Sequence, residues 1–140
     1  MNDPVKPFYI PVRVYYEDTD SGGVVYYANY LKFMERARTE YLRRLGFEQD
    51  DLARDEAVIF AVRSVMIDYI LPARFNDQLQ VSASVIEQGR ASLVFYQEVI
   101  KEASQMVLCK GTIKIASLDS STFRPKSIPK KILLELNDVG

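Results

Sequence analysis

The chain of 140 residues contains no histidine. Histidine is the usual general base near neutral pH. Its absence excludes Ser-His-Asp and Cys-His catalysis as well as zinc sites built on histidine. The only cysteine, Cys109, cannot form an intramolecular disulfide or a thiolate metal site, and a single thiol fits a reducing compartment. Catalysis by this chain therefore has to use carboxylate, tyrosine, lysine, hydroxyl, thiol or backbone groups.

The sequence also lacks long apolar runs and a strong charge of one sign. No stretch approaches the ~20 apolar residues of a membrane-spanning helix. The first eleven residues, "MNDPVKPFYIP", have no basic start followed by an apolar run, so we expect no secretory signal. The net charge of −1 gives no bulk attraction to nucleic acid or to a membrane surface. We expect a soluble cytoplasmic protein that binds no nucleic acid.

The hydrophobic pattern predicts one domain over residues 1–140, of the α+β class. Residues 12–17 are rich in β-branched and aromatic side chains and predict a strand, whereas residues 27–46 predict a long amphipathic helix. Further strands are predicted at 57–71, 78–88, 91–101 and 105–118, with helical turns at 48–55 and a short helix at 130–137. Short turns favour antiparallel pairing of these strands, with the helix against one face. Such a sheet leaves an open edge, which favours oligomers.

Side-chain positions follow from the same periodicities. We expect the apolar stripe of the long helix and one face of strand 78–88 to be buried, and Cys109 to be an inert core thiol. We expect Asp68 to lie on a solvent face or to be hydrogen-bonded rather than catalytic. The stripe contains Tyr30, Phe33, Met34, Ala37, Tyr41 and Leu45, and the strand face contains Leu79, Val81, Ala83 and Val85. The charged residues of the helix are predicted to lie mostly on its solvated faces, with the arginines paired to Glu35 and Glu40. These charged residues are Glu35, Arg36, Arg38, Arg43 and Arg44.

One segment, "EDTDSGGVVYYANY" at 17–30, combines carboxylates, two glycines and three tyrosines before a helix. Gly22 and Gly23 allow unusual backbone dihedrals close to a ligand. The helix start, near Tyr27, offers N–H groups without intrahelical partners and a partial positive charge. This arrangement suits attack on a carbonyl, with Asp20 as base or nucleophile and N–H groups near Tyr27 holding the developing oxyanion.

Other interpretations of these residues stay open. Asp and Gly before a helix are ordinary capping and turn residues. The carboxylates could instead bind Mg²⁺ or Ca²⁺, although no EF-hand pattern follows. Tyr26, Tyr27 and Tyr30 are of a type more often found in a core than stacked on a ligand. Arg90, in a predicted tight turn, could meet phosphates, and so could the arginines of the long helix, which are Arg36, Arg38, Arg43 and Arg44.

The stretch "VYYEDTDSGGVVYYANYLKFMERARTEYLR" closely resembles the signature of the 4-hydroxybenzoyl-CoA thioesterase family. It is closer still to the branch of bacterial acyl-CoA thioesterases associated with the Tol-Pal system. The resemblance extends from about Pro11 to about Leu136 and includes "DYILPARFND", "GRASLVFYQEV" and "RPKSIPK". The core pattern, D-x-x-G-x-V-x-[HY]-x-N-Y, is specific to the family.

The resemblance implies a hot-dog fold, in which a five-stranded antiparallel sheet wraps a long central helix. It also implies a homodimer with a continuous sheet, often paired into a homotetramer, with active sites between subunits that hydrolyse CoA thioesters without metal or organic cofactor. By position, Asp20 matches the catalytic carboxylate and Tyr27 the residue whose backbone N–H polarises the thioester carbonyl. Gly23 matches the glycine that shapes the loop, and Arg90 a basic position that meets the CoA phosphates in some relatives. Asn29 and Tyr30, which close the motif, are assigned structural roles.

One position departs from the closest branch, which usually carries histidine where this chain has Tyr27. The hydroxybenzoyl branch carries tyrosine there. A phenol is a poor base at neutral pH, so we expect the Tyr27 hydroxyl to act as a hydrogen-bond donor. The lack of histidine also argues against hot-dog dehydratases, which rely on one. Attack by Asp20 to form an anhydride and deprotonation of water by Asp20 both fit the sequence.

Two alternatives use the same fold. One is a non-catalytic module that binds an acyl carrier or an envelope system and needs no chemistry from Asp20. The other is a thioesterase that acts on acyl carrier protein, for which the basic segment "FRPKSIPKK" at 123–131 would be the docking patch rather than a solvated tail.

Overall fold

The computed structural model describes residues 8–139, with side chains described as far as Leu136. The strands are β1 (Phe8–Arg13), β2 (Val58–Tyr69), β3 (Gln78–Gln88), β4 (Ser92–Lys101) and β5 (Met106–Asp119). The helices are α1 (Asn29–Arg44), α2 (Gln49–Glu56) and α3 (Lys130–Val139), and a short 3-10 turn, η1, spans Tyr16–Asp18. The five strands form one antiparallel sheet in the order β1-β3-β4-β5-β2.

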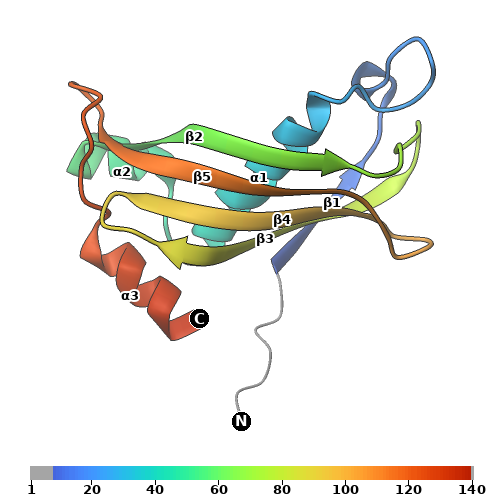
Figure 1. Cartoon of the computed structure of the whole chain (residues 1–140). Coiled ribbons are helices and arrows are strands. Elements are labelled where there is room, and N and C mark those ends of the chain that lie inside the picture. The colour runs from blue at the N-terminus through green and yellow to red at the C-terminus, as the bar shows by residue number, and fades with distance from the viewer. Residues whose placement is uncertain (1–7, 140) are drawn as a thin grey trace.

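Helix α1 crosses one face of this sheet and packs against β1, β3 and β4 (Figure 1). The predicted arrangement of one long helix on a five-stranded antiparallel sheet is therefore confirmed. Buried residues of α2 and α3, including Leu52 and Ile132, join the same hydrophobic cluster as the helix and the sheet. Within residues 8–139, no helix is long and apolar enough to cross a membrane.

The predicted strand at 12–17 was misplaced. Strand β1 begins at least four residues earlier and ends at Arg13. After that residue, the N–H of Val14 bonds to the Asp77 carbonyl at 3.0 Å instead of continuing the ladder with β3. The N–H of Tyr15 then bonds to the Asp18 carboxylate at 2.9 Å, and this contact starts a tight turn. Aromatic and β-branched composition indicated a strand, but the local carboxylate offered the backbone a better partner.

The predicted core positions are largely confirmed. Leu79, Val81 and Ala83 are fully buried on the α1 side of β3, and Asp68 is exposed on β2. Cys109 is fully buried, and burial raises the pKa of its thiol to about 12. A thiol with so high a pKa holds almost no thiolate at neutral pH, so it packs as a small apolar group.

Arg38 contradicts the prediction that the charged residues of α1 lie on solvated faces. Its side chain is buried between α1 and the sheet, and the residue is only 8% exposed. The guanidinium donates to Oε1 of Gln97 on β4 at 3.0 Å. Gln97 in turn donates to the carbonyls of Met34 at 2.9 Å and Ser82 at 3.0 Å, so it joins the helix to two strands. Burial lowers the pKa of Arg38, and the nearby Glu35 opposes this effect.

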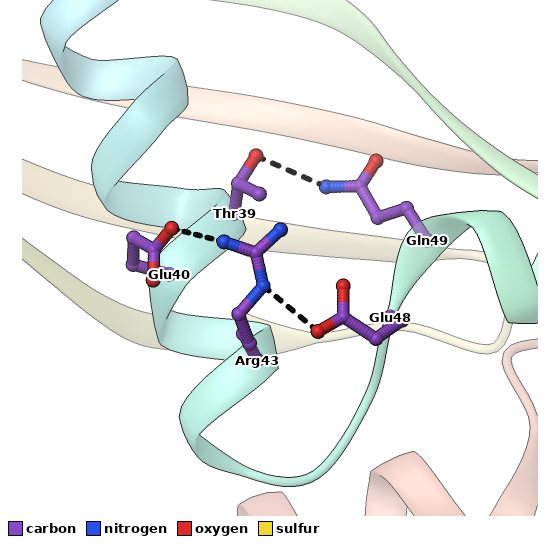
Figure 2. A network of polar contacts seen from close by, with 5 residues as sticks. All are labelled: Thr39, Glu40, Arg43, Glu48 and Gln49. Carbon is purple, nitrogen blue, oxygen red and sulfur yellow. Dashed lines mark hydrogen bonds and ion pairs between the residues drawn. The ribbon is translucent and has the colours of Figure 1, made fainter.

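The outer face of α1 follows the prediction. Arg43 forms ion pairs with Glu40, on the same helix, and with Glu48 at 2.8 Å, in the loop before α2 (Figure 2). Gln49 donates to the Thr39 hydroxyl at 3.2 Å in the same network. Exposed ion pairs of this kind contribute under about 1 kcal/mol each, so the network fixes the α1–α2 corner more than it stabilises the fold.

Candidate active site

The segment between β1 and α1 is a small hairpin fixed at its base. Thr19 and Val25 pair as an isolated antiparallel bridge. The N–H of Tyr26 bonds to the Asp18 carbonyl at 2.9 Å, and the N–H of Val25 bonds to the Ala73 carbonyl at 2.8 Å. These contacts hold Asp20, in the turn of the hairpin, on the same short unit that leads into α1.

The geometry of the turn requires glycine at position 23 and leaves little space for a side chain at Gly22. Gly23 has a φ of +80°, a conformation that L side chains rarely adopt, and its N–H bonds to the Asp20 carbonyl at 3.1 Å. A Cβ at Gly22 would lie 3.2 Å from Oδ1 of Asp20. The turn therefore holds the backbone against the Asp20 carboxylate, as the glycine pair suggested.

The Asp20 carboxylate accepts the N–H of Gly22 through Oδ1 at 2.8 Å. Among residues 8–139, its second oxygen accepts no hydrogen bond, and the residue is exposed. Asp20 therefore stabilises its own turn, as one alternative interpretation proposed. It does not cap α1, because the residue before that helix is Ala28 and no side chain caps it. One carboxylate oxygen stays available for chemistry.

The N-terminus of α1 is left open. Asn29 N–H bonds to the Tyr26 carbonyl at 2.8 Å, which closes a turn with Tyr27 and Ala28 at its centre. Across the described part of the chain, neither the Tyr27 N–H nor the Ala28 N–H donates a hydrogen bond. A side-chain cap would stabilise the helix by about 1 kcal/mol, so the uncapped end costs stability. Two adjacent free donors at a helix N-terminus are suited to bind an oxyanion.

Asn29 and Tyr30 anchor this end of the helix. The Asn29 side-chain amide donates to the Asp18 carbonyl at 2.9 Å, and the Tyr30 hydroxyl accepts the N–H of Ala73 at 3.0 Å. Burial raises the pKa of Tyr30. These contacts support the structural roles expected for both residues, because they tie the helix to the hairpin and to the turn before β3.

Of the three tyrosines in the motif, only Tyr30 is a core residue, with 3% exposure. Tyr26 is 46% exposed and Tyr27 is 60% exposed, so the core interpretation was wrong for both. The Tyr27 ring lies edge-on to the Tyr69 ring at 6.1 Å between centroids. The side chain of Tyr27 is therefore accessible at the surface of a single chain.

Arg90 does not lie near Asp20 within one chain. It follows β3, whose other end adjoins Val14 and the hairpin. Eleven residues of strand span about 35 Å, which separates the two ends of the sheet by that distance. Arg90 instead donates to the Ser127 hydroxyl at 2.8 Å. Any joint action of Arg90 and Asp20 on one ligand requires a second chain.

One open pocket, of about 560 Å³, lies beside this site rather than over it. Its lining consists of Arg13, Val14, Tyr15, Tyr16, Glu17, Phe75 and Asn76. Neither Asp20 nor Tyr27 contributes to it. This pocket therefore does not enclose the chemical groups of the hairpin.

Sequence reasoning missed Tyr69 at the end of β2. Its hydroxyl donates to the Tyr27 carbonyl at 3.2 Å across 42 positions of sequence. Burial raises the pKa of Tyr69, and Cys109 and Tyr27 add smaller effects in the same direction. Tyr69 lies in the motif "DYILPARFND", but only the sheet register brings it to α1.

Comparison with known proteins agrees with this geometry. The family model of the thioesterase superfamily matches residues 22–108, more than half of the chain. The acyl-CoA thioesterase YbgC of Haemophilus influenzae is 45% identical over 125 residues, which cover 89% of this chain and 90% of the relative. The acyl-CoA thioester hydrolase YbgC of Escherichia coli O6:H1 is 42% identical over 125 residues, covering 89% and 92%.

The fold has a close structural counterpart. A 1,4-dihydroxy-2-naphthoyl-CoA thioesterase from Synechocystis superposes with a TM-score of 0.87, covering 95% of this chain and 97% of the other, at 19% identity. That likeness concerns the fold alone. Together with the observed sheet and helix, it confirms the α+β hot-dog prediction. The matched family model and the two curated relatives show that the chain belongs to the thioesterase superfamily.

Proposed function

We propose that the protein is an acyl-CoA thioesterase, which hydrolyses a CoA thioester to a free acid and CoA. The observation that carries this proposal is the hairpin between β1 and α1. It places a carboxylate with an unused oxygen, Asp20, on the same unit as the open N-terminus of α1 at Tyr27 and Ala28. The names of the two YbgC relatives, a thioesterase and a thioester hydrolase for acyl-CoA, agree with this chemistry.

The helix N-terminus is the proposed oxyanion site. When the acyl carbon becomes tetrahedral, its oxygen gains negative charge, and preorganised N–H groups stabilise that charge more than they stabilise the ground-state carbonyl. The Tyr27 N–H has no competing partner among the described residues, so it is available to the substrate oxygen. The uncapped helix end thus lowers the stability of the protein slightly and leaves an N–H group available for catalysis.

Asp20 can act by two routes, and both consume one water. As a nucleophile, its oxygen attacks the acyl carbon, the C–S bond breaks and CoA leaves as thiolate. Water then hydrolyses the resulting anhydride and restores the carboxylate. As a general base, Asp20 takes a proton from water, whose oxygen attacks the acyl carbon, and the leaving thiolate receives that proton.

The tyrosine at position 27 is compatible with this mechanism. Its contribution is the backbone N–H, which every residue except proline has. The Tyr27 side chain is exposed, with its ring held edge-on to Tyr69, and it can meet a substrate as a hydrogen-bond donor. Replacement of histidine by tyrosine therefore keeps the oxyanion donor. Gly23 supports the site by allowing the turn that carries Asp20.

A homodimer or homotetramer with sites between subunits fits the open edge of the sheet. Strand β2 is twelve residues long, and among residues 8–139 it pairs only with β5, so no described strand covers its other edge. Val62, Val65 and Met66 on this strand are 53%, 40% and 77% exposed. Antiparallel pairing of two β2 strands would cover this apolar strand and bring the partner's Arg90 end toward the Asp20 end of the first chain, where Arg90 is proposed to meet the CoA phosphates.

The finer assignment rests on the sequence motif. We place the chain, as one domain over residues 1–140, in the Tol-Pal-associated branch of the 4-hydroxybenzoyl-CoA thioesterase family, acting in the cytoplasm. The pattern from Asp20 to Tyr30 supports the branch, and the single buried thiol of Cys109 suits a reducing compartment.

The test is release of free thiol from a panel of acyl-CoAs with short, long and aromatic acyl groups, followed with a thiol reagent. Catalytic release from at least one CoA ester is expected, and the preferred acyl group identifies the substrate class. Release from acyl carrier protein alone would replace the proposal with a carrier-protein thioesterase. Binding of acyl-CoA or acyl carrier protein without thiol release would contradict hydrolysis and identify a binding module.

A further inference from the structure

Tyr69 lies where the inner face of β2 meets the start of α1. It pairs with Cys109 of β5, whose side chain is in the core. Its ring packs edge-on against the Tyr27 ring, with an interplanar angle of 85°, and lies 5.6 Å from the Tyr30 ring. Two aromatic contacts therefore hold the phenol in place, and its hydroxyl reaches the Tyr27 carbonyl at 3.2 Å.

This carbonyl belongs to the same peptide unit as the Ala28 N–H. The unit is planar and trans, so its C=O and N–H point in opposite directions, and a contact that fixes one also fixes the other. A hydrogen bond accepted by the carbonyl polarises the peptide and makes its N–H a stronger donor. Among the described residues, the Ala28 N–H has no acceptor of its own.

We propose that Tyr69 is a positioning residue, which orients and polarises the Tyr27–Ala28 peptide so that the Ala28 N–H becomes a second oxyanion donor beside the Tyr27 N–H. The inference rests on the proposed thioester hydrolysis, and it adds a donor and a residue on a different strand to that site. The proton of the phenol stays on Tyr69 throughout, and no bond to the substrate forms there.

The arrangement acts mainly on the transition state. A thioester carbonyl carries little charge in the ground state, whereas the tetrahedral oxygen carries nearly a full negative charge. The hydrogen bond from Tyr69 to the peptide, and the bond from that peptide to the substrate oxygen, therefore stabilise the transition state more than the ground state. Loss of the hydroxyl should lower kcat and leave substrate binding nearly unchanged.

Tyr69→Phe tests the inference, because it removes only the hydroxyl and keeps the ring packed against Tyr27 and Tyr30. Loss of one neutral hydrogen bond predicts a kcat about 3- to 12-fold lower, with KM within about twofold of wild type. Binding of a CoA thioether, which lacks the carbonyl oxygen, should not change. Tyr96→Phe is the matched control: its hydroxyl bonds to Glu98 at 2.9 Å on β4, away from the hairpin, and kcat should stay at the wild-type value.

A second variant addresses the donor itself. Ala28 has a φ of −69°, which proline adopts, so Ala28→Pro removes the N–H. Because proline also restricts the residue before it, circular dichroism and urea unfolding of the variant check that the turn before α1 is kept. Loss of a direct oxyanion donor should lower kcat by roughly 10²-fold. Adding Tyr69→Phe to that variant should then have no further effect on kcat, because the hydroxyl acts through the missing N–H.

The outcomes separate the two claims. A wild-type protein that releases no thiol from any acyl-CoA contradicts the proposed function. An active wild type with unchanged kcat in Tyr69→Phe overturns the positioning role alone. The role is also overturned if Tyr96→Phe loses as much activity, if KM rather than kcat changes in Tyr69→Phe, or if the effects of Ala28→Pro and Tyr69→Phe multiply.

Discussion

The buried contact between Arg38 and Gln97 predicts an unusual pattern of stability. Gln97→Leu keeps the approximate volume of the side chain but removes the acceptor for the Arg38 guanidinium and two donors to the carbonyls of Met34 and Ser82. A hydrogen bond to a charged group contributes about 1.5–3 kcal/mol and each neutral one about 1 kcal/mol. The free energy of unfolding should therefore fall by roughly 3–5 kcal/mol.

The second substitution should rescue the first. Arg38→Met alone leaves Oε1 of Gln97 without a donor, which costs about 1–3 kcal/mol. In the double variant, both partners are apolar and no unpaired cation stays buried, so we expect a loss of only about 1–3 kcal/mol relative to wild type. The double variant is thus more stable than Gln97→Leu, with a coupling free energy of about 2 kcal/mol or more.

Urea denaturation of the four proteins, at one fixed protein concentration because oligomers unfold in a concentration-dependent way, measures this cycle. Arg36→Met, on the exposed face of α1, serves as the control for loss of a helix arginine and should change the free energy of unfolding by less than about 1 kcal/mol. A double variant whose loss equals the sum of the two single losses would refute the account of Arg38 as a buried cation that depends on Gln97.

Three further predictions concern the turn, the core thiol and the shared site. Gly23→Ala, at a φ of +80°, should destabilise the protein by about 1–2 kcal/mol in urea and lower kcat, because the turn carries Asp20. The pKa of the Cys109 thiol is raised from 9.0 to about 12, so its contribution to stability is present below pH 9 and is lost as the pH rises toward 12. Between pH 9 and 10.5, the free energy of unfolding should therefore fall faster for wild type than for Cys109→Val. Equal slopes for the two proteins would contradict this. If each site takes Asp20 and Arg90 from different chains, refolding a mixture of Asp20→Asn and Arg90→Glu subunits should restore about a quarter of wild-type turnover at low acyl-CoA concentration. No recovery of turnover would argue against shared sites.

The regular elements could be predicted because their patterns are local. Alternation of Leu79, Val81 and Ala83 with polar residues marked β3 at its observed bounds, and the apolar stripe marked α1 to within two residues at each end. The unusual backbone conformation near Gly23 could also be predicted, because paired glycines after a carboxylate indicate a turn with unusual dihedrals.

Contacts between distant parts of the chain could not be read in this way. An arginine at position 38 indicated a solvated helix face. Its buried acceptor, Gln97, is 59 positions away in the sequence and could not be recognised from the local pattern. Tyr69 looked like one of many aromatic strand residues until the β2–β5 register brought its hydroxyl to Tyr27. The distance of Arg90 from Asp20 likewise depends on which end of the sheet each loop occupies, and this is set by the topology.

The open end of α1 is the feature that neither composition nor periodicity could identify. Sequence patterns indicate caps by the presence of Ser, Thr, Asp or Asn, and Asp20 was a reasonable candidate. In the structure, Asp20 lies eight residues before the N-cap Ala28, its carboxylate accepts the N–H of Gly22, and no side chain caps the helix. A carboxylate and a free helix end on one hairpin are what the proposed chemistry needs.

The most direct test of that chemistry is the turnover of Asp20→Asn with the preferred acyl-CoA, beside wild type and Asp18→Asn. The Asp18 carboxylate accepts the Tyr15 N–H at 2.9 Å, an interaction that an asparagine oxygen can keep, so this control neutralises a neighbouring carboxylate in the same loop. We predict that Asp20→Asn folds normally and loses roughly 10²- to 10⁴-fold in kcat, while Asp18→Asn stays within about threefold of wild type. Wild-type turnover by Asp20→Asn would contradict the proposed active site.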